Sequence, residues 1–339
     1  MTSKINKIAV IGGGSWGTAL AILFSKQGNN VYLWTKNKYI ERLNINRENN
    51  KYLPGINFPK NLKIDSNFQN VCTNAKIVFI VIPSHSFRNI FNELLPFLED
   101  NCITISAVKG IENNSLKTMT QIMNEEIRKK NYKEKRIKTG VLSGPSFAKE
   151  VAVDIPTAVT IGFNDIKTAQ GIQDIINSNN FRVYASSDVI GLEISAAFKN
   201  IIAIATGVSD GIGYGLNTRA ALITRGLAEI TRLGIALGAK KETFSGLSGI
   251  GDLILTCTGD LSRNRSVGLK LGQGKTMEII KKEMSMVAEG IKTTKSGYKL
   301  AKKTKIEMPI LEQVYKIIYK NKNCKKAVNE LLGRVAKIE

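Results

Sequence analysis

The feature that most constrains this chain is a glycine pattern near its start, Gly12-x-Gly14-x-x-Gly17. An apolar run over residues 7–11 precedes the pattern, and a segment of helical character, TALAILFSKQG, follows it. In such a context the first glycine permits a tight turn, the second leaves room for a pyrophosphate, and the third lets the helix pack close to the strand. The pattern therefore predicts a strand, a dinucleotide-binding turn and a helix at the start of the fold.

Further apolar runs continue this alternation. Buried strands are predicted at residues 31–34, 77–83, 102–108, 139–144, 157–162 and 181–185, with helical segments between most of them. After about residue 188 the strand-like runs end, and helical periodicity with glycine turns replaces them. We therefore predict an α/β fold, with an N-terminal Rossmann-type doubly wound, mostly parallel sheet followed by an all-helical C-terminal domain. The dinucleotide-binding domain is expected over residues 1–188, and the helical substrate and catalytic domain over residues 189–339.

The charge balance is strongly basic, since 49 Lys and Arg against 28 Asp and Glu give a formal net charge of +21 over 339 residues. Such a charge can indicate binding to nucleic acid or to an acidic membrane surface. Here the basic residues are scattered among acidic ones, and the densest run, residues 128–138, has no aromatic residue besides Tyr132. A solvated surface explains such clusters better. We expect neither nucleic acid nor a membrane as a partner, although a basic surface attracts anionic substrates.

Signals for targeting and for metal binding are missing from the sequence. The N-terminus has no signal-peptide apolar region, and the apolar runs are expected to fall short of the ~20 residues that a membrane helix needs. Four cysteines lie far apart without a CxxC pair, and the single histidine, His85, excludes histidine-rich metal sites. We expect a cytoplasmic protein with reduced thiols and no bound metal.

The residues after the second predicted strand bear on the type of cofactor. In most dinucleotide-binding folds an acidic residue there binds the ribose 2′-hydroxyl. This chain has the sequence TKNK at residues 35–38 and no carboxylate. Lys36, with Lys38, can instead pair with a 2′-phosphate, which favours NADP(H) over NAD(H); the alternative is that Lys36 is one exposed lysine among many. Ser15 and Trp16, inside the glycine turn, are expected to touch the cofactor.

Loops at the carboxyl ends of the strands border the cofactor crevice in this architecture. His85 follows the third predicted strand, and we expect it to pack within its loop or line the cofactor rather than exchange protons. Lys109 follows the fourth strand and is expected to point into the same crevice. Residues 143–150, SGPSFAKE, form a turn that opens a short helix. Ser146 can cap this helix, and the turn can also form a wall of the nicotinamide and substrate site.

In the helical half, Lys199 stands inside an apolar helix, after residues 196–198 (AAF) and shortly before residues 201–202 (II). Burial would lower the pKa of its amine toward the range of an acid–base catalyst, and with one histidine in the chain Lys199 is the best candidate proton donor. Asn200, beside it, can form hydrogen bonds. Asp252 is a lone carboxylate among glycine and apolar residues, which can orient Lys199, bind a substrate hydroxyl, or cap a helix.

A further helix is predicted to start at Ser262, a good N-cap residue, with Arg263 and Asn264 in its first turn. Cationic side chains in a first turn oppose the helix dipole, so a bound anion is a natural compensation. Together with Lys199, this turn indicates a phosphorylated carbonyl compound as the substrate. Residue types and spacing alone lead no further than that.

The chain resembles the bacterial-type NAD(P)-dependent glycerol-3-phosphate dehydrogenases from about residue 7 to about residue 335. The likeness is carried by the blocks IGGGSWGTALA, VIPSHSF, AVKGIE, SGPSFAKEVA, AFKNIIAIATGVSDGIGYGLNTRAALITRGLAE, SGIGDLILTCT, LSRNRSVG and VAEGIKTTK, in family order. The resemblance implies the reversible reduction of dihydroxyacetone phosphate to sn-glycerol 3-phosphate with NAD(P)H, which supplies glycerophospholipid synthesis. It also implies a Rossmann domain followed by a helical domain, and a homodimer.

By motif match, the resemblance also implies a set of site residues. Besides the glycines, those expected to line the cofactor are Ser15, Trp16, Lys36, Lys109, Ala148, Arg263, Val287 and Glu289. Those expected to hold the substrate are Lys109, Gly144, Ser146, Lys199, Asp252, Ser262, Arg263 and Asn264. Lys199 would be the acid–base residue, and Arg263 with Asn264 would hold the phosphate.

Three alternatives stay open at this point. The first is a related hydride-transferring enzyme that acts on a 3-hydroxyacid or on 6-phosphogluconate. The SRNR block and the pairing of AFKN with GD favour a three-carbon phosphate as the substrate over these two. The second is a basic nucleic-acid-binding protein. The third is a dinucleotide sensor that binds NADPH and turns over no substrate.

Overall fold

The computed structural model describes residues 7–129, 132–284 and 288–335, and it divides the chain into two compact units. The first unit runs to Val108 and resumes over Met119–Val189, and the second comprises Lys109–Thr118 and the chain from Ile190 onward. The short segment Lys109–Thr118 therefore groups with the helical unit, which a single cut after residue 188 does not anticipate. The functional assignment of residues 1–188 and 189–339 stays a prediction.

The first unit is built around one eight-stranded sheet. Its strands follow the order β10 (Phe181–Ser186), β9 (Thr157–Phe163), β8 (Lys138–Ser143), β7 (Ile103–Ser106), β6 (Ile77–Ile80), β1 (Ile8–Ile11), β2 (Val31–Trp34) and β5 (Lys63–Asp65). Neighbouring strands are parallel except for the antiparallel pair of β8 and β9. The predicted doubly wound, mostly parallel sheet is confirmed. The sequence analysis missed β5 because its three residues, KID, form no apolar run.

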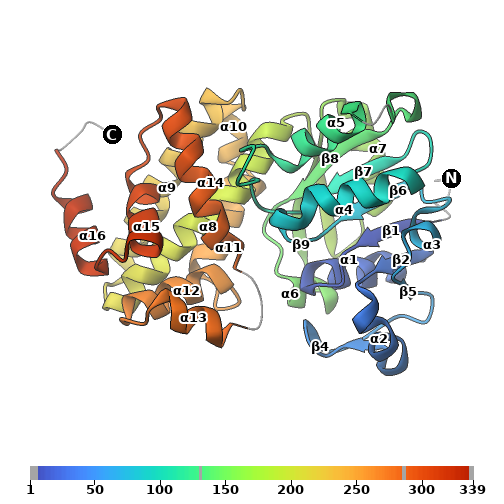
Figure 1. Ribbon diagram of the computed structural model, residues 1–339, viewed down its shortest axis with the longest axis horizontal. Helices are drawn as coiled ribbons and strands as arrows, with labels where there is room; N and C mark the ends of the chain where they lie inside the picture. Colours follow the sequence, from blue (N-terminus) through green and yellow to red (C-terminus); the bar gives the residue numbers. More distant parts are fainter. Residues whose placement is uncertain (1–6, 130–131, 285–287, 336–339) are drawn as a thin grey trace. The chain divides into compact units, whose positions relative to one another are not determined.

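Helices cover both faces of this sheet (Figure 1). They are α1 (Ser15–Lys26), α2 (Ile40–Asn46), α3 (Phe68–Cys72), α4 (Phe87–Leu94), α5 (Met119–Lys129), α6 (Ala148–Ala152) and α7 (Ile166–Ile176), with a small hairpin of β3 (Glu48–Asn49) and β4 (Leu53–Asn57). Because successive strand residues face opposite ways, Ile8 and Val10 pack in one core with α1 and α7, while Ala9 and Ile11 pack in the other with α3, α4 and α5. This arrangement explains why the central strands are apolar on both faces.

The strand order reverses beside β1, which has β2 on one side and β6 on the other. In open α/β sheets, ligands bind outside the carboxyl ends of the strands at such a reversal. The glycine turn follows the carboxyl end of β1, so the topology places it at the position where a dinucleotide is expected.

The second unit is helical apart from its connecting turns. Its helices are α8 (Val189–Ile212), α9 (Leu216–Ala236), α10 (Lys241–Phe244), α11 (Asp252–Thr258), α12 (Arg263–Gly272), α13 (Met277–Glu283), α14 (Glu289–Thr304), α15 (Pro309–Lys320) and α16 (Cys324–Leu332), with a π-helical turn over Leu247–Gly251. The segment from Lys109 joins their core through Ile111, which is 1% exposed and whose carbonyl oxygen accepts a hydrogen bond from Ser296 at 3.2 Å.

Helix α8 is the one helix in the described ranges that is long and apolar enough to cross a membrane. This corrects the expectation that no apolar run reaches that length, because the helix continues through Gly207 and Gly211. In its most apolar 18-residue window, 89% is buried in the structure. Helix α8 is therefore a buried helix in the core of its unit.

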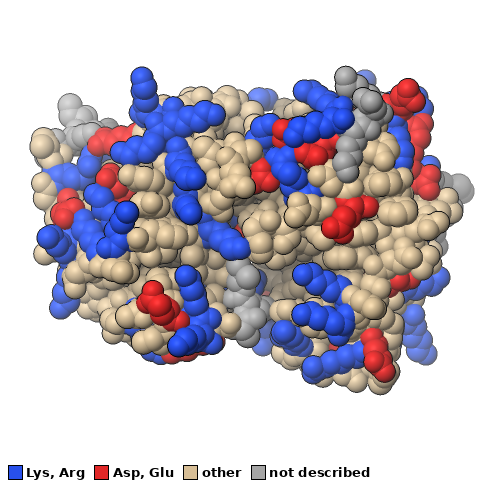
Figure 2. Space-filling view, in the orientation of Figure 1, with Lys and Arg blue, Asp and Glu red and all other residues tan. Residues whose placement is uncertain are grey.

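The charged side chains of each unit are spread over its surface. Figure 2 shows lysine and arginine side chains scattered over the visible face of both units, with aspartate and glutamate side chains among them. On this face a row of basic side chains follows α14, and further basic side chains are scattered over the other elements. The basic excess is thus distributed in the manner that is typical of a solvated surface.

A buried carboxylate, Glu229, joins two helices of the second unit. It lies on α9 and accepts backbone hydrogen bonds from Ile310 at 2.7 Å and Leu311 at 3.3 Å, at the start of α15. Burial raises the pKa of Glu229 from 4.5 to about 7, and the two backbone N–H groups oppose this rise. The carboxyl therefore binds its proton more tightly in the folded state than in the unfolded state.

The substitution Glu229→Gln is expected to remove a pH dependence of stability. The contribution of Glu229 is fully present below about pH 4.5 and is lost as pH rises through about 7, whereas glutamine does not titrate and can still accept a backbone N–H. The free energy of unfolding of the variant, relative to wild type, should therefore rise by about 3 kcal/mol between pH 4.5 and pH 8. Denaturant unfolding at both pH values measures this difference. Glu312→Gln, at a carboxylate 38% exposed on α15, is the control for the loss of a carboxylate from the same unit.

Candidate active site

The glycine turn of the first unit leaves space for a ligand. Gly12 has φ of +132°, and a Cβ atom there would lie 2.2 Å from the carbonyl oxygen of Val81. A Cβ atom on Gly17 would lie 1.9 Å from the carbonyl oxygen of Gly12, whereas one on Gly14 would meet no atom within 4 Å. Gly12 and Gly17 are thus required by the packing of β1, β6 and α1. Gly14 faces open space, so packing does not require a glycine there. The lack of a side chain instead allows a phosphate to approach the backbone closely.

Helix α1 begins directly after this turn in a manner that suits an anion. Its N-cap residue, Gly14, has no side chain to bind the first N–H groups, and its first turn contains no acidic residue. Ser15 donates its hydroxyl to the carbonyl oxygen of Tyr52 at 2.6 Å. The indole N–H of Trp16 is buried without a hydrogen-bond partner in the described part of the chain. These features fit the pyrophosphate and the neighbouring groups of a dinucleotide.

The end of β2 is basic, as the sequence indicates. Lys36 is exposed and follows the buried Thr35, and Lys38 lies over the ring of Tyr39 at 5.1 Å. A hollow beside Gly13 has further basic and aromatic walls that the sequence analysis missed. It is lined by Gly13, Tyr39, Arg42, Leu43, Asn49, Asn50, Lys51 and Tyr52. The only sequence signal for this wall is the basic and aromatic content of residues 38–52.

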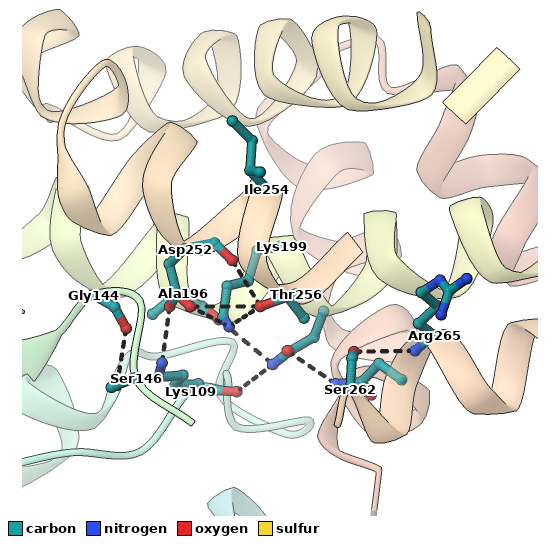
Figure 3. Close-up of polar contacts among 12 residues, drawn as sticks. Lys109, Gly144, Ser146, Ala196, Lys199, Asp252, Ile254, Thr256, Ser262 and Arg265 are labelled. Carbon is teal, nitrogen blue, oxygen red and sulfur yellow. Dashed lines mark hydrogen bonds and ion pairs between the residues drawn. The ribbon is translucent and has the colours of Figure 1, made fainter. Parts of the chain in front are cut away.

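The SGPSFAKE turn follows β8 in the first unit. Gly144 has φ of +131°, and the hydroxyl of Ser146 donates to the carbonyl oxygen of Gly144 at 3.0 Å (Figure 3). Helix α6 begins at Ala148 with Phe147 as its N-cap and without a side-chain cap. The expectation that Ser146 caps this helix is therefore wrong, because its hydroxyl is directed back to the turn. His85 is exposed, on the short 3-10 turn Ser84–Ser86.

Two lysines and one aspartate form the polar centre of the second unit (Figure 3). Lys199 Nζ on α8 donates to Asp252 Oδ1 at 2.7 Å, and Lys109 Nζ donates to Asp252 Oδ2 at 2.8 Å. The side chains of Asp252, Lys199 and Lys109 are 1%, 6% and 18% exposed. Asp252 is the first residue of α11 and not its N-cap, so its carboxylate serves the lysines. Two ammonium groups on one carboxylate leave a net positive charge in a poorly hydrated place.

Thr256 completes the surroundings of the Lys199 amine, and the sequence analysis missed it. Its hydroxyl donates to the carbonyl oxygen of Asp252 at 2.7 Å and accepts a hydrogen bond from Lys199. The sequence signal that could have identified Thr256 is its position four residues after Asp252, which places both side chains on one face of a helix. An ammonium group has three N–H donors. The third donor of Lys199 has no hydrogen-bond partner among residues 7–129, 132–284 and 288–335.

Burial lowers the pKa of Lys199 from 10.5 to about 8. The neighbouring Asp252 carboxylate opposes this change, whereas the Lys109 ammonium adds to it. The amine can therefore gain and lose a proton near neutral pH, which is the property that an acid–base catalyst requires.

A chain of side-chain amides links this centre to the start of α12. Asn200 donates to the carbonyl oxygen of Lys109 at 3.3 Å, and its Oδ1 accepts a hydrogen bond from Asn264 at 2.9 Å. The Oδ1 atom of Asn264 in turn accepts the backbone N–H of Gly290 at 3.0 Å. The amides therefore hold three segments of the second unit, those of Lys109, α12 and α14, in a fixed arrangement.

The first turn of α12 is the candidate anion site. Ser262 is its N-cap and accepts the backbone N–H of Arg265 at 3.3 Å, as predicted. Arg263 is exposed in this turn and interacts electrostatically with Glu289, at the start of α14. No acidic residue lies in the turn. Val287, which the resemblance placed at the cofactor, lies outside the described residues.

The geometry supports acid–base chemistry on an anionic substrate in the second unit, and dinucleotide binding in the first. Among the described residues, no group of three or more His, Cys, Asp or Glu side chains is arranged to hold a metal ion. The chemical groups available are thus an amine with a pKa near neutrality, a second ammonium group, and a helix N-terminus with a guanidinium group.

Comparison with known proteins agrees with this arrangement. Residues 7–169 match the family described as NAD-dependent glycerol-3-phosphate dehydrogenase N-terminus, and residues 188–329 match the corresponding C-terminus. The glycerol-3-phosphate dehydrogenase [NAD(P)+] of Desulfotalea psychrophila is 56% identical over the full length of both chains. The crystal structure of glycerol-3-phosphate dehydrogenase from Coxiella burnetii has a TM-score of 0.92 and 37% identity, covering 97% of this chain and 99% of that one.

A second solved structure is similar in fold alone. A ketopantoate reductase from Ralstonia eutropha has a TM-score of 0.61 at 13% identity, over 95% of this chain and 99% of that one. The full-length matches to both halves of one family decide the assignment. The chain belongs to the family of NAD(P)+-dependent glycerol-3-phosphate dehydrogenases, and it is an oxidoreductase of that class.

Proposed function

We propose that this enzyme reduces dihydroxyacetone phosphate to sn-glycerol 3-phosphate with NAD(P)H, reversibly, and that Lys199 exchanges the proton. The observation that carries the proposal is the buried Lys199 amine, which has a pKa of about 8, two protein hydrogen bonds and a third donor without a partner in the described part of the chain. A carbonyl oxygen that gains negative charge during reduction needs a proton donor and a positive field. Lys199 supplies both, and Lys109 adds to the positive field.

The cofactor supplies a hydride to the carbonyl carbon in reduction and accepts it in oxidation. In reduction, the Lys199 ammonium group delivers a proton to the substrate oxygen, and Asp252 with Thr256 holds the amine in place. In oxidation, the neutral Lys199 amine takes the proton of the substrate hydroxyl. Asp252 accepts a hydrogen bond from Lys109 as well as from Lys199. Its carboxylate therefore stays in place, and holds the Lys199 amine, during both reduction and oxidation.

The phosphate of the substrate is assigned to the first turn of α12. Arg263 offers a guanidinium fork, and Ser262 and Asn264 stand beside it at the positive end of the helix. Binding energy gained at the phosphate orients the carbonyl group at Lys199. From the first unit, Gly144 and Ser146 are proposed to contribute to substrate binding, on the strength of their motif.

The cofactor is assigned to the first unit. Gly12, Gly14 and Gly17 shape the turn for the pyrophosphate, with Ser15 and Trp16 beside it. Lys36 is proposed to bind the 2′-phosphate of NADP(H). Lys109, Ala148, Arg263 and Glu289 are proposed to line the rest of the cofactor, by motif match.

The substitution Lys36→Glu is expected to weaken NADPH binding by about tenfold or more while changing NADH binding little, because it replaces an attractive charge beside a dianionic phosphate by a repulsive one. Titration of cofactor fluorescence measures both dissociation constants without turnover. Lys60→Glu, at an exposed lysine of the same unit, is the control for the change in net charge. An equal loss for the two cofactors would exclude Lys36 from the 2′-phosphate site.

The wider setting follows from the reaction. We propose a cytoplasmic homodimer whose product enters glycerophospholipid synthesis.

The proposed function is tested by following NADPH and NADH absorbance with dihydroxyacetone phosphate, and NADP+ and NAD+ reduction with 6-phosphogluconate. Turnover of the three-carbon phosphate is expected; its absence, with NADPH bound, would indicate a sensor. A salt-sensitive DNA shift without oxidation of NADPH would instead support the nucleic-acid alternative.

A further inference from the structure

Helices α8 and α12 are in backbone contact within the second unit. Gly207 and Gly211 lie one turn apart on α8, and Gly268 and Gly272 lie one turn apart on α12. A Cβ atom on Gly207 would lie 2.1 Å from the carbonyl oxygen of Arg265, and one on Gly268 would lie 2.1 Å from that of Ile204. The two glycine pairs therefore allow the helices to approach until their backbones touch.

An ion pair fixes the same two helices beside this contact. The Oδ2 atom of Asp210, near the end of α8, accepts a hydrogen bond from Nε of Arg265 at 3.0 Å and forms an ion pair with its Nη2 at 2.9 Å. Its Oδ1 accepts two hydrogen bonds from Arg219 on α9, at 3.0 and 2.9 Å. The side chains of Asp210 and Arg265 are 7% and 15% exposed. Such a largely buried pair holds its geometry more firmly than an exposed pair does.

Arg265 belongs to the turn that is the candidate phosphate site. Its backbone N–H is the donor that Ser262 caps (Figure 3). Its guanidinium also binds Asp260 in the preceding loop at 2.8 Å. Asp260 is 96% exposed, so this second pair is weak. Asp210 is therefore the anchor through which Arg265 attaches the turn to α8.

Lys199 lies on the same helix as this anchor, eleven residues before Asp210, or about 16 Å at 1.5 Å per residue. Asn200, the next residue, holds Asn264 at 2.9 Å. Helix α8 thus carries the proton-exchanging amine and also two attachments of the α12 turn. Helix α8 therefore contributes directly to the separation between the amine and the turn.

We propose that Asp210 is a positioning residue for the reaction. Through Arg265 it fixes the anion-binding turn Ser262–Asn264 at a set distance from Lys199, and so selects substrates by the spacing between their phosphate and their carbonyl group. This inference rests on the proposed function, because it requires the substrate phosphate at that turn. Asp210 itself acts without touching substrate or cofactor.

The test compares two substrates in Asp210→Asn and Arg265→Gln enzymes. Each substitution is expected to lower kcat/KM for dihydroxyacetone phosphate by about 10- to 100-fold, the effect of a misplaced anchor remote from the chemistry. Neither should change kcat/KM for dihydroxyacetone, which has no phosphate, by more than about twofold. Because both act through one contact, the double variant should resemble the single variants. Arg219→Gln, which keeps the contact between Asp210 and Arg265, is the matched control and should have little effect on either substrate.

The possible outcomes separate the inference from the proposed function. Equal losses with both substrates would show that Asp210 supports only the fold and would overturn the inference. If Arg263→Ala weakens use of the phosphorylated substrate but Asp210→Asn does not, the inference fails and the proposed function stands. If Arg263→Ala has no effect on that substrate, the phosphate site itself is wrong, and the inference fails with it. Should Asp210→Asn not fold, Arg265→Gln, in which Asp210 keeps Arg219, decides alone.

Discussion

Lys199→Ala enzyme is expected to reduce dihydroxyacetone phosphate with a kcat lowered by ~10²-fold or more, while binding NADPH as the wild type does. The substitution removes the proton donor and one of the two ammonium groups at Asp252, so both proton transfer and charge stabilisation are weakened. NADPH binding should be kept because the proposed cofactor site lies mainly in the first unit. Steady-state kinetics and cofactor fluorescence measure the two quantities separately.

Two further variants show which property of Lys199 is used. Lys199→Arg keeps a positive charge but cannot release a proton at neutral pH, so its kcat should stay close to that of the alanine variant if proton transfer dominates. Lys316→Ala, at a half-buried lysine of α15 paired with Glu312, should leave kcat unchanged. A near-normal kcat in Lys199→Ala enzyme would refute the assignment.

The assignment of Lys199 as the acid–base residue also predicts how the rates of the wild-type enzyme change with pH. Because burial lowers the pKa of Lys199 to about 8, the amine is largely protonated below that pH and largely neutral above it. Reduction needs the protonated form, so its rate should fall as pH rises through about 8. Oxidation needs the neutral form, so its rate should rise over the same interval. Neither inflection should be present in the Lys199→Arg enzyme.

The fold was largely predictable because its signals are local. Four-residue apolar runs such as IAVI and IVFI each form a strand buried on both faces, and the glycine pattern after the first of them predicts the turn and the start of α1. Strand β5 gave no such signal, since its pairing with β2 depends on tertiary structure. The same holds for the grouping of Lys109–Thr118 with the helices, which depends on the burial of Ile111.

The residue types of the site were predictable, but their partners were not. Lys199 is conspicuous because a lysine in an apolar helix requires a partner, and Asp252 is conspicuous as a lone carboxylate. That Lys109 shares this carboxylate, or that Asn200 and Asn264 form an amide chain, depends on contacts between residues 64 to 143 positions apart. Ser146 illustrates the reverse case, in which a local capping rule gave way to a hydrogen bond within the turn.

Arg263→Ala is expected to lower kcat/KM for dihydroxyacetone phosphate by about 10³-fold, because it removes the guanidinium that is proposed to pair with the substrate phosphate. In the first turn of α12 no acidic side chain balances the helix N-terminus, which supports the proposal that the guanidinium and the turn together bind the phosphate. Because that binding orients the carbonyl group, kcat should fall as well as KM rise. Dihydroxyacetone, which lacks the phosphate, should be used equally by both enzymes.

The matched control is Arg232→Ala, which removes an exposed guanidinium of α9 that donates to the carbonyl oxygen of Glu307 at 3.1 Å. It makes the same change in net charge within the same unit, so any general attraction of anions by this basic protein is weakened equally. Arg263→Lys should lie between wild type and alanine, because lysine keeps the charge and loses the two-pronged geometry. If Arg232→Ala and Arg263→Ala reduced kcat/KM alike, the substrate would be attracted by the field of the whole surface and not bound at the α12 turn.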